Sequence, residues 1–395
     1  MSAFSATDAS SRPPSAQRSR GRTYWREMDW VLIVAAVGVT IFGAVLVWSA
    51  SRADMASAND PQSYLKRHLI NVVIAIALGF VASRLDYRWL RAYTPIIYIV
   101  SLLLLLVVFV PGLGTSIAGA RAWIDLPGGF TFQPSEFAKI AVIIMMAAIL
   151  AEKRDFEIEP HDRDVFMSVG VAVLPILIIL LQNDTGTVLI LGSLALSVIA
   201  VSGARRRWMI GLIGGAIIGL LLAVQLGLLQ SYQVSRLTSF LNPTGETGGA
   251  TYSSTQAQIA VGGGGWTGYG LFEGPQTQGK FVPVNESDFI FTVVGEELGF
   301  IGSTLLILLI CVILWRAIRI AMKANDLYGR LIATGVVAWL AFQTFENIGM
   351  TLGIMPITGI PLPLVSAGGT SMMSTWIAIG LLENVRLHSA RSAPA

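Results

Sequence analysis

Long apolar segments, separated by shorter polar ones, run through most of the chain. A helix needs about 20 residues to cross a hydrocarbon core of about 30 Å. Segments close to that length recur about ten times, at residues 30–50, 69–83, 94–111, 137–150, 166–181, 188–204, 208–229, 289–315, 331–349 and 370–382. The pattern predicts an all-α polytopic membrane protein with about ten transmembrane helices.

Composition supports this fold class. Hydrophobic residues make up 54% of the chain and charged residues only 13%, and the mean hydropathy is +0.66. A soluble protein would need more polar residues to cover its surface, so that class is excluded. The single cysteine, Cys311, lies inside an apolar segment, where we expect it to serve in packing.

The basic residues predict the orientation. Short cytoplasmic loops are enriched in Lys and Arg, and a cytoplasmic N-terminus places 20 of the 27 basic residues on that side. The other seven are Arg52, Lys66, Arg67, Arg121, Lys139, Arg236 and Lys280. Both termini are therefore predicted to be cytoplasmic, with residues 231–288 forming a long extracytoplasmic loop between helices 7 and 8. The net charge of +3 then reflects topology, and we expect no nucleic acid partner.

Three parts of the chain follow from this layout. Residues 1–27 are rich in Ser, Ala, Arg and Pro, which predicts a disordered cytoplasmic tail. Residues 28–388 form the ten-helix membrane domain, and residues 389–395 a cytoplasmic C-terminal tail. The first apolar segment is interpreted as an uncleaved signal anchor because no cleavage site follows it.

Polar residues at the outer edge of the fourth span are the first candidate for chemistry. Arg121 and Trp123 precede it, and Glu136 and Lys139 lie in its first turn, where a spacing of three places them on one face. Ser135 is a candidate cap for this helix. A local ion pair is the simpler explanation, but charges at the entry of an apolar span favour a pocket-facing role.

The long loop supplies the second candidate. Arg236 lies near its start, and Lys280, Glu286 and Asp288 lie near its end. Loops of this length without regular structure are usually functional or disordered. Asp288 could serve as a helix cap or as a catalytic acid or base; we favour chemistry.

Neighbouring segments carry weaker predictions. Residues 254–261 could form a short interfacial helix, which the glycines at 262–265 would end, and we interpret these glycines, together with Gly268 and Gly270, as flexible loop. Glu296 and Glu297 lie deeper in the membrane, where a basic partner is expected. Residues 182–187 form a polar turn, read first as an ordinary helix-hairpin connection.

The last two spans are joined by an irregular outer segment. Asn347 precedes it, prolines and glycines fill residues 356–363, and Ser366 opens a second small-residue run that ends at 371. Such backbone is tolerated at membrane depth only where protein or a water-filled cavity surrounds it. This segment is therefore expected to line the same pocket.

Together these stretches resemble the SEDS family of bacterial cell-wall synthesis, whose members include RodA and FtsW. The resemblance covers residues 121–139, 182–187, 232–291, 295–299 and 347–371 in order. Residues 359–363 and 368–371 look more like the elongation member, RodA. The chain departs from the family pattern at Val284, where Glu is usual, at Ser287, where Thr is usual, and at Asn183, where Pro is usual.

The resemblance implies a peptidoglycan glycosyltransferase that polymerises lipid II at the outer face of the cytoplasmic membrane during cell elongation. Asp288 would be the general base of an inverting transfer that releases polyprenyl pyrophosphate. The expected substrate-binding residues are Arg121, Trp123, Glu136, Lys139, Arg236, Lys280, Asn347 and Ser366. A divalent cation, Mg or Mn, is a candidate cofactor, with Asp288 and Glu136 as candidate ligands.

The same resemblance implies three partners: lipid II, the growing lipid-linked glycan strand, and a class B penicillin-binding protein acting as transpeptidase. Two alternatives stay open. A lipid II flippase would need functional charges along a path across the bilayer, whereas here they gather on the outer side. A non-catalytic scaffold for the transpeptidase would tolerate changes at Asp288.

Overall fold

The computed structural model describes residues 26–55, 63–117, 119–127, 130–152, 159–227, 233–234, 236, 240 and 248–392. Most of the predicted N-terminal tail and the first part of the long loop lie outside these residues. At the other end, the last helix continues to Ser392, into the predicted C-terminal tail.

A helix occupies each of the ten predicted spans in the described chain. These helices are α2 (Trp30–Met55), α3 (Ser63–Arg84), α4 (Tyr87–Val107), α5 (Pro134–Leu150), α6 (Asp162–Leu181), α7 (Thr185–Val201), α8 (Arg206–Gln225), α12 (Ile290–Lys323), α13 (Leu327–Thr351) and α14 (Gly369–Ser392). Seven of them are long and apolar enough to cross a membrane, and α7 is a shorter apolar helix. The predicted class, a helical polytopic membrane protein, is confirmed.

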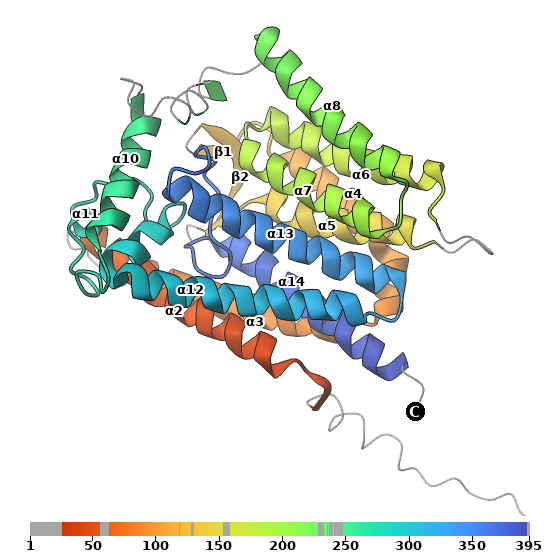
Figure 1. The fold of residues 1–395 in the computed structure, drawn as a ribbon, viewed down its shortest axis with the longest axis horizontal. Helices are drawn as coiled ribbons and strands as arrows, with labels where there is room; N and C mark the ends of the chain where they lie inside the picture. The colour runs from red at the N-terminus through yellow and green to blue at the C-terminus, as the bar shows by residue number, and fades with distance from the viewer. Residues whose placement is uncertain are drawn as a thin grey trace, which may run out of the picture.

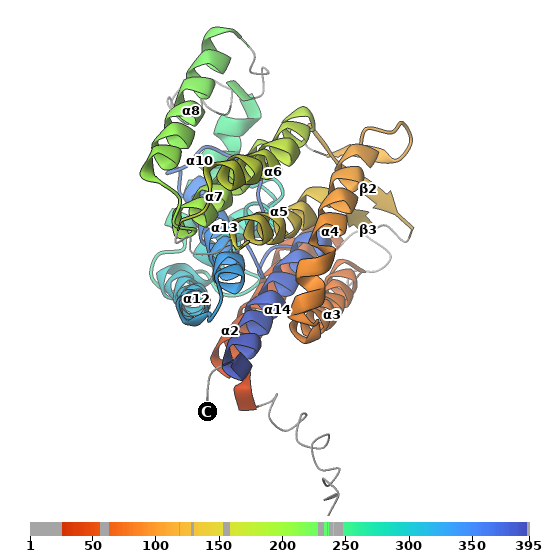
Figure 2. The same cartoon turned by 90° about the vertical axis from the view of Figure 1, so that its right-hand side faces the viewer.

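The helices lie side by side with their axes running between the two ends of the bundle (Figure 1). The closest pairings are α14 with α3, α12 with α2 and α13, α13 with α7, and α5 with α4. Their shared core includes the fully buried side chains of Trp339, Tyr328 and Ile143. Helix α8 leans away from the bundle (Figure 2) and has no buried residue.

Helix α12 differs from the single span expected at residues 289–315. It runs for 34 residues, about 51 Å at 1.5 Å per residue, which exceeds the hydrocarbon thickness. Gly299 breaks it, with φ 63° and ψ −159° inside the helix. A short first part before Gly299 therefore precedes the longer spanning part.

Smaller elements gather at one end of the bundle, opposite the C-terminus (Figure 1). Helix α10 (Gly248–Gly263) contains the interfacial helix expected at 254–261 and is longer than predicted, and α11 (Pro275–Gln278) follows it. Strands β1 (Gly114–Ile117), β2 (Ala120–Leu126) and β3 (Phe130–Phe132) form an antiparallel sheet in that order. The hydropathy pattern did not predict the sheet.

Candidate active site

A cavity of about 750 Å³ lies where these smaller elements meet the helix ends. One wall is the three-stranded sheet, and another is the start of α3. The remaining walls are the N-terminal ends of α5, α7 and α14, Arg236, and the segments 284–288 and 358–361. The polar segments selected from the sequence thus converge on one hollow.

Asp288 lines this cavity at the end of a tightly held turn. The Asn347 side chain donates from Nδ2 to the carbonyl oxygens of Asp288 and Ile360, each at 2.7 Å. The Ser366 hydroxyl donates to the carbonyl of Ser287 at 2.5 Å. Both predicted binding residues are buried and act on the backbone, so they position Asp288 within the cavity wall.

The backbone before Asp288 is strained at Val284, whose φ is +54°. A β-branched residue rarely adopts the left-handed region, where its Cβ crowds the following carbonyl. Two backbone hydrogen bonds to the Val284 carbonyl, from Ser287 and Phe289, close the turn. Such strain is typical of functional sites, and here it coincides with a departure from the family pattern.

The carboxylate of Asp288 is not the N-cap of α12, since that position is Phe289. Its Oδ1 accepts a hydrogen bond from the Ser287 hydroxyl at 3.2 Å. Burial raises the pKa of Asp288 to about 6, against the opposing effects of the Ser287 hydrogen bond and the charge of Arg236. The alternative interpretation as a helix cap therefore has no support in the geometry.

Arg236 lies beside Asp288 at Gly359. Its Nη1 donates to the Thr358 carbonyl at 3.2 Å. A Cβ placed on Gly359 would lie 3.3 Å from Asp288 Oδ2 and 4.0 Å from Arg236 Nη2. Gly359 also has a φ of +74°, so a glycine is required here both for the backbone and for the approach of the two charged groups.

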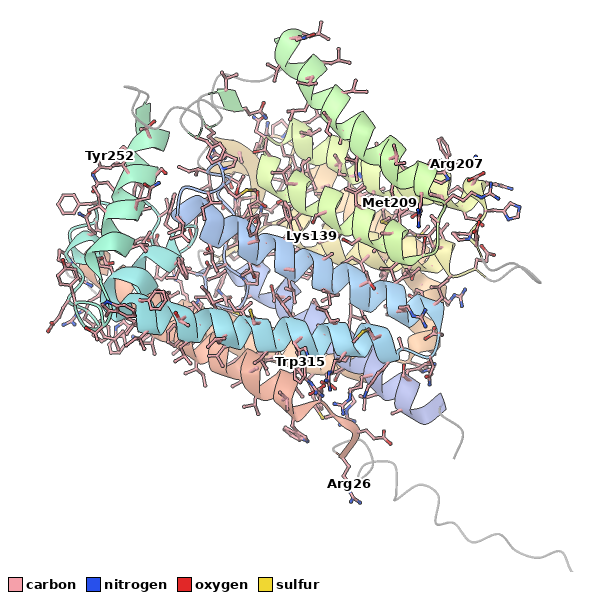
Figure 3. The ribbon with its side chains drawn as sticks, viewed as in Figure 1. Arg26, Lys139, Arg207, Met209, Tyr252 and Trp315 are labelled. Carbon is pink, nitrogen blue, oxygen red and sulfur yellow. The ribbon has the colours of Figure 1, made fainter. Side chains whose placement is uncertain are left out.

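Glu136 and Lys139 form an ion pair at the base of the cavity. Lys139 Nζ lies 2.8 Å from Glu136 Oε1 and 3.1 Å from Gln343 Oε1, and 4.5 Å from the centre of the Trp339 ring. Ser374 donates to the other Glu136 oxygen at 2.7 Å. Glu136 lines the cavity, whereas Lys139 is fully buried in the bundle interior (Figure 3) and is not among the lining residues.

Of the other three predicted binding residues, one lines the cavity and two do not. Trp123, on β2, lines the cavity. Arg121 donates to the carbonyls of Phe109 and Val110 at the end of α4, at 3.3 and 3.5 Å. Lys280 donates to the Ala50 carbonyl at 2.7 Å and lies 3.9 Å from Glu286 Oε2. Neither cation is among the residues that line the cavity.

Asp184 also lines the cavity, although its sequence pattern predicts only a turn. It is the N-cap of α7, as expected of a turn, because it accepts from the Thr187 amide at 3.1 Å. Its Oδ2 also accepts from Gln133 at 3.1 Å and Thr187 Oγ1 at 2.8 Å. Gln133 and Asp184 therefore join the turn at 182–187 to the start of α5. Ser135, expected to cap α5, instead points to Asp184 at 3.4 Å.

Helix α3 adds polar groups that the hydropathy pattern did not single out. Arg67, His68 and Asn71 all line the cavity. Within the described part of the chain, His68 Nε2 and Asn71 Oδ1 are buried without a hydrogen-bond partner. They lie at the start of an apolar span, where the pattern predicts only a membrane helix.

The described donor set does not fit a resident metal. Magnesium and manganese prefer several oxygen ligands. Among the described residues there is no group of three or more Asp, Glu, His or Cys side chains that could hold a metal. Glu136, one candidate ligand, already accepts from Lys139 and Ser374 through its two oxygens.

Known proteins resemble the chain over most of its length. The model of the FtsW/RodA/SpoVE family, described as cell cycle proteins, matches residues 29–391. Stage V sporulation protein E of Bacillus subtilis is 37% identical over 91% of this chain and 97% of its own length. A probable peptidoglycan glycosyltransferase FtsW of Geobacter metallireducens is 38% identical over 90% of this chain and 94% of its own.

Two solved structures share the fold. A chain of a peptidoglycan synthase complex, studied for the coordination of polymerization and crosslinking, superposes with a TM-score of 0.75 at 28% identity, covering 92% of this chain and 99% of that one. The rod shape determining protein RodA of Thermus thermophilus gives a TM-score of 0.66 at 27% identity, covering 94% and 99%. The family match over nearly the whole chain, with these relatives, places the protein in the FtsW/RodA/SpoVE family of multi-pass membrane proteins, the SEDS family.

Proposed function

We propose that this protein is a peptidoglycan glycosyltransferase that polymerises lipid II at the outer face of the cytoplasmic membrane. The observation that carries the proposal is Asp288, held by Asn347 and Ser366 in the wall of a large cavity beside Arg236. The names of the relatives support the same reaction class, since those from Geobacter are probable peptidoglycan glycosyltransferases.

The proposed reaction is a single inverting displacement. The Asp288 carboxylate takes the proton of an acceptor sugar hydroxyl, and that oxygen attacks the anomeric carbon of the donor. The new glycosidic bond forms as the bond to the lipid pyrophosphate breaks, so the pyrophosphate leaves with the electron pair. A raised pKa suits this role, because a base near neutrality accepts the proton more readily than an ordinary aspartate.

The predicted binding residues divide into two proposed groups, those that line the cavity and those that support its walls. Arg236 lies near Asp288 and is positioned to stabilise the charge of the leaving pyrophosphate. Trp123 offers a ring to the sugars, and Glu136 a carboxylate at the cavity base. Lys139 and Asn347 do not line the cavity, and each is proposed to hold a residue that does, Glu136 and Asp288 respectively. Arg121 and Lys280 hold neighbouring backbone and are proposed to support the cavity walls.

The finer biological role is also a proposal. Residues 359–363 and 368–371 favour the elongation role of RodA, although the sequence relatives include sporulation and division proteins. A class B penicillin-binding protein is the proposed transpeptidase partner, supported by the similarity to a chain of a peptidoglycan synthase complex. A growing lipid-linked strand would be the second substrate.

Polymerisation of lipid II by the purified protein tests the proposal. Asp288→Asn keeps the shape and hydrogen-bonding capacity of the side chain but removes the base, so we expect a loss of about 10³-fold in glycan chain formation. Asp125→Asn makes the same change on the exposed part of β2, outside the cavity lining, and should retain the wild-type rate.

The same assay separates the alternatives. A flippase would form no chains in detergent, with or without Asp288. A scaffold would support cell growth equally well when it carries Asp288→Asn, so complementation of a depleted strain by that variant would contradict an enzymatic role.

A further inference from the structure

A second cavity lies at the end of the bundle remote from Asp288. It has a volume of about 320 Å³ and is lined by Asp29, which precedes α2, by the C-terminal part of α12 and by the last turns of α14. Its charged lining residues are Asp29, Arg316, Arg319, Lys323 and Arg386. Four cations and one carboxylate therefore face one small hollow.

The carboxylate is already neutralised by part of this set. Asp29 is buried, and its oxygens lie 2.5–3.0 Å from the Arg316 guanidinium and 3.5 Å from Arg386. The nearby carboxylate of Glu383 accepts from the Asp29 backbone amide at 3.1 Å. This ion-pair cluster joins α2, α12 and α14, and it accounts for two of the four cations.

Arg319 and Lys323 remain as excess positive charge. Within the described residues, neither side chain lies within ion-pair distance of a carboxylate. Arg319 is instead held on the ring of Trp315, with Cζ 4.3 Å from the centroid. The dipole of α12 favours a cation in its last turn, which explains the position of Lys323. Arg319 lies a turn earlier, where the dipole does not explain a cation.

The surface beside the cavity is apolar, and its exposed tryptophan favours a position at the membrane interface. Trp315 is 48% exposed, and tryptophans of membrane proteins concentrate at headgroup depth. Leu308 and Met322 are also exposed, and their spacing of seven from Trp315 puts all three on one stripe of α12. Figure 3 shows Trp315 toward the end of the bundle where Arg26 also lies, away from Tyr252.

We propose that this cavity binds the phosphate of an anionic phospholipid from the leaflet on the side of the chain termini. The phosphate lies between Arg319 and Lys323, and one acyl chain follows the stripe of Leu308, Trp315 and Met322. A zwitterionic lipid binds less well, because Asp29, the one carboxylate among the described lining residues, is already paired with arginine and is not available to an amine. The bound lipid adds to the ion-pair cluster that joins α2, α12 and α14.

Native mass spectrometry of the full chain in detergent tests this site with phosphatidylglycerol and phosphatidylcholine as probes. We expect the wild type to retain phosphatidylglycerol preferentially. The double variant R319Q/K323Q should bind it about thirtyfold more weakly, since each basic side chain near an anionic lipid contributes about 1 kcal/mol. Both side chains are exposed and outside the Asp29 cluster, so this variant retains the fold.

R206Q/R330Q is the matched control, because it removes the same charge from two exposed positions outside the cavity lining. It should bind phosphatidylglycerol within twofold of the wild type. Equal loss in both double variants, or equal retention of the two lipids, would overturn the proposal.

Inorganic phosphate alone, followed by thermal shift, distinguishes the source of the anion. Stabilisation by phosphate that requires Arg319 and Lys323, without phosphatidylglycerol binding, would overturn a lipid site in favour of a soluble anion.

Discussion

Two opposing influences act on the pKa of the Asp288 carboxylate. Burial disfavours its charged form, while Arg236 and the Ser287 hydroxyl favour it, and burial has the larger effect. A general base needs this balance, because a fully stabilised carboxylate would be too weak a base and an unassisted one would stay protonated.

The pH dependence of polymerisation follows from the raised pKa of Asp288, about 6. The base acts only when deprotonated, so the rate should be constant above about pH 7 and fall about tenfold per pH unit well below pH 6. Initial rates of chain formation from pH 5 to 8 measure this profile. The residual activity of Asp288→Asn should lack the inflection, and a wild-type profile flat down to pH 5 would exclude Asp288 as the base.

Lys139 is expected to affect stability, because its charge is fully buried against Glu136. Lys139→Met keeps most of the volume but leaves Glu136 without its ion-pair partner, which should cost about 3 kcal/mol of stability. Thermal inactivation of the purified protein in detergent measures the effect.

The double variant E136Q/K139M removes both charges and should recover much of the stability lost in Lys139→Met, since no unpaired charge remains. Recovered stability with weak polymerisation would separate the structural part of the pair from its part in catalysis. No recovery would mean that Lys139 stabilises the fold through its packing on Trp339 instead.

At the scale of elements, the glycines after α10 are a packing surface. Gly264 and Gly268 lie directly against the backbone of α12, and the amides of Tyr269 and Gly270 donate to the carbonyls of Glu296 and Glu297 at 3.0 Å. Their interpretation as flexible loop was wrong, because a run of glycines indicates loop freedom and close backbone approach equally well.

Gly268→Ala should therefore destabilise the protein strongly. Gly268 has a φ of +77°, and a Cβ there would meet the Glu297 carbonyl oxygen at 2.1 Å, so strain and overlap together should cost about 3 kcal/mol. Gly265→Ala isolates the strain, because Gly265 has a φ of +56° with open space around its Cβ position; about 1 kcal/mol is expected. Equal thermal inactivation of the two variants would contradict the packing role.

Hydropathy predicted the ten helices well, because membrane solvation alone requires about 20 apolar residues per span. It could not predict β1 to β3 or the break in α12 at Gly299, since these depend on neighbours distant in sequence. Glu296 illustrates the limit. A basic partner was expected, but the carboxylate accepts from the amides of Gln276 and Thr277 at 2.6 and 2.8 Å, at the start of α11.

The candidate site was predictable to a similar degree. Asp288, Trp123 and Glu136 were found from charges and aromatics at span ends, and all three line the cavity. Lys139 and Asn347 lie in the same region but are buried outside the cavity lining. Whether a residue lines the cavity depends on the direction of its side chain, which the sequence does not show. The sequence predicted a turn at Asp184, and Asp184 does cap α7. A cap residue can also line a cavity, as Asp184 does, and a turn pattern alone does not indicate this.

At the scale of the molecule, two charged regions lie at opposite ends of the bundle. The polar cavity with Asp288 is lined by the sheet and by the N-terminal ends of α5, α7 and α14, and the arginine-rich cavity by Asp29 before α2 and by the last turns of α12 and α14. The sheet and α10 lie at one end of the bundle and the end of α14 at the other (Figure 1). The proposed reaction on lipid substrates that present pyrophosphate outside the cell requires the first cavity to face outward. The excess of Lys and Arg at the second end favours the same orientation, with both termini cytoplasmic.

Cysteine labelling tests this orientation directly. In a Cys311→Ser background, Thr255→Cys on α10 and Ala390→Cys near the end of α14 each introduce one exposed thiol, at opposite ends of the molecule. A membrane-impermeant maleimide applied to intact spheroplasts should label Thr255→Cys, and label Ala390→Cys only after the membrane is permeabilised, because the excess of Lys and Arg predicts a cytoplasmic position for the basic end. The reverse pattern would place Asp288 on the cytoplasmic side, where it could not act on a substrate presented outside.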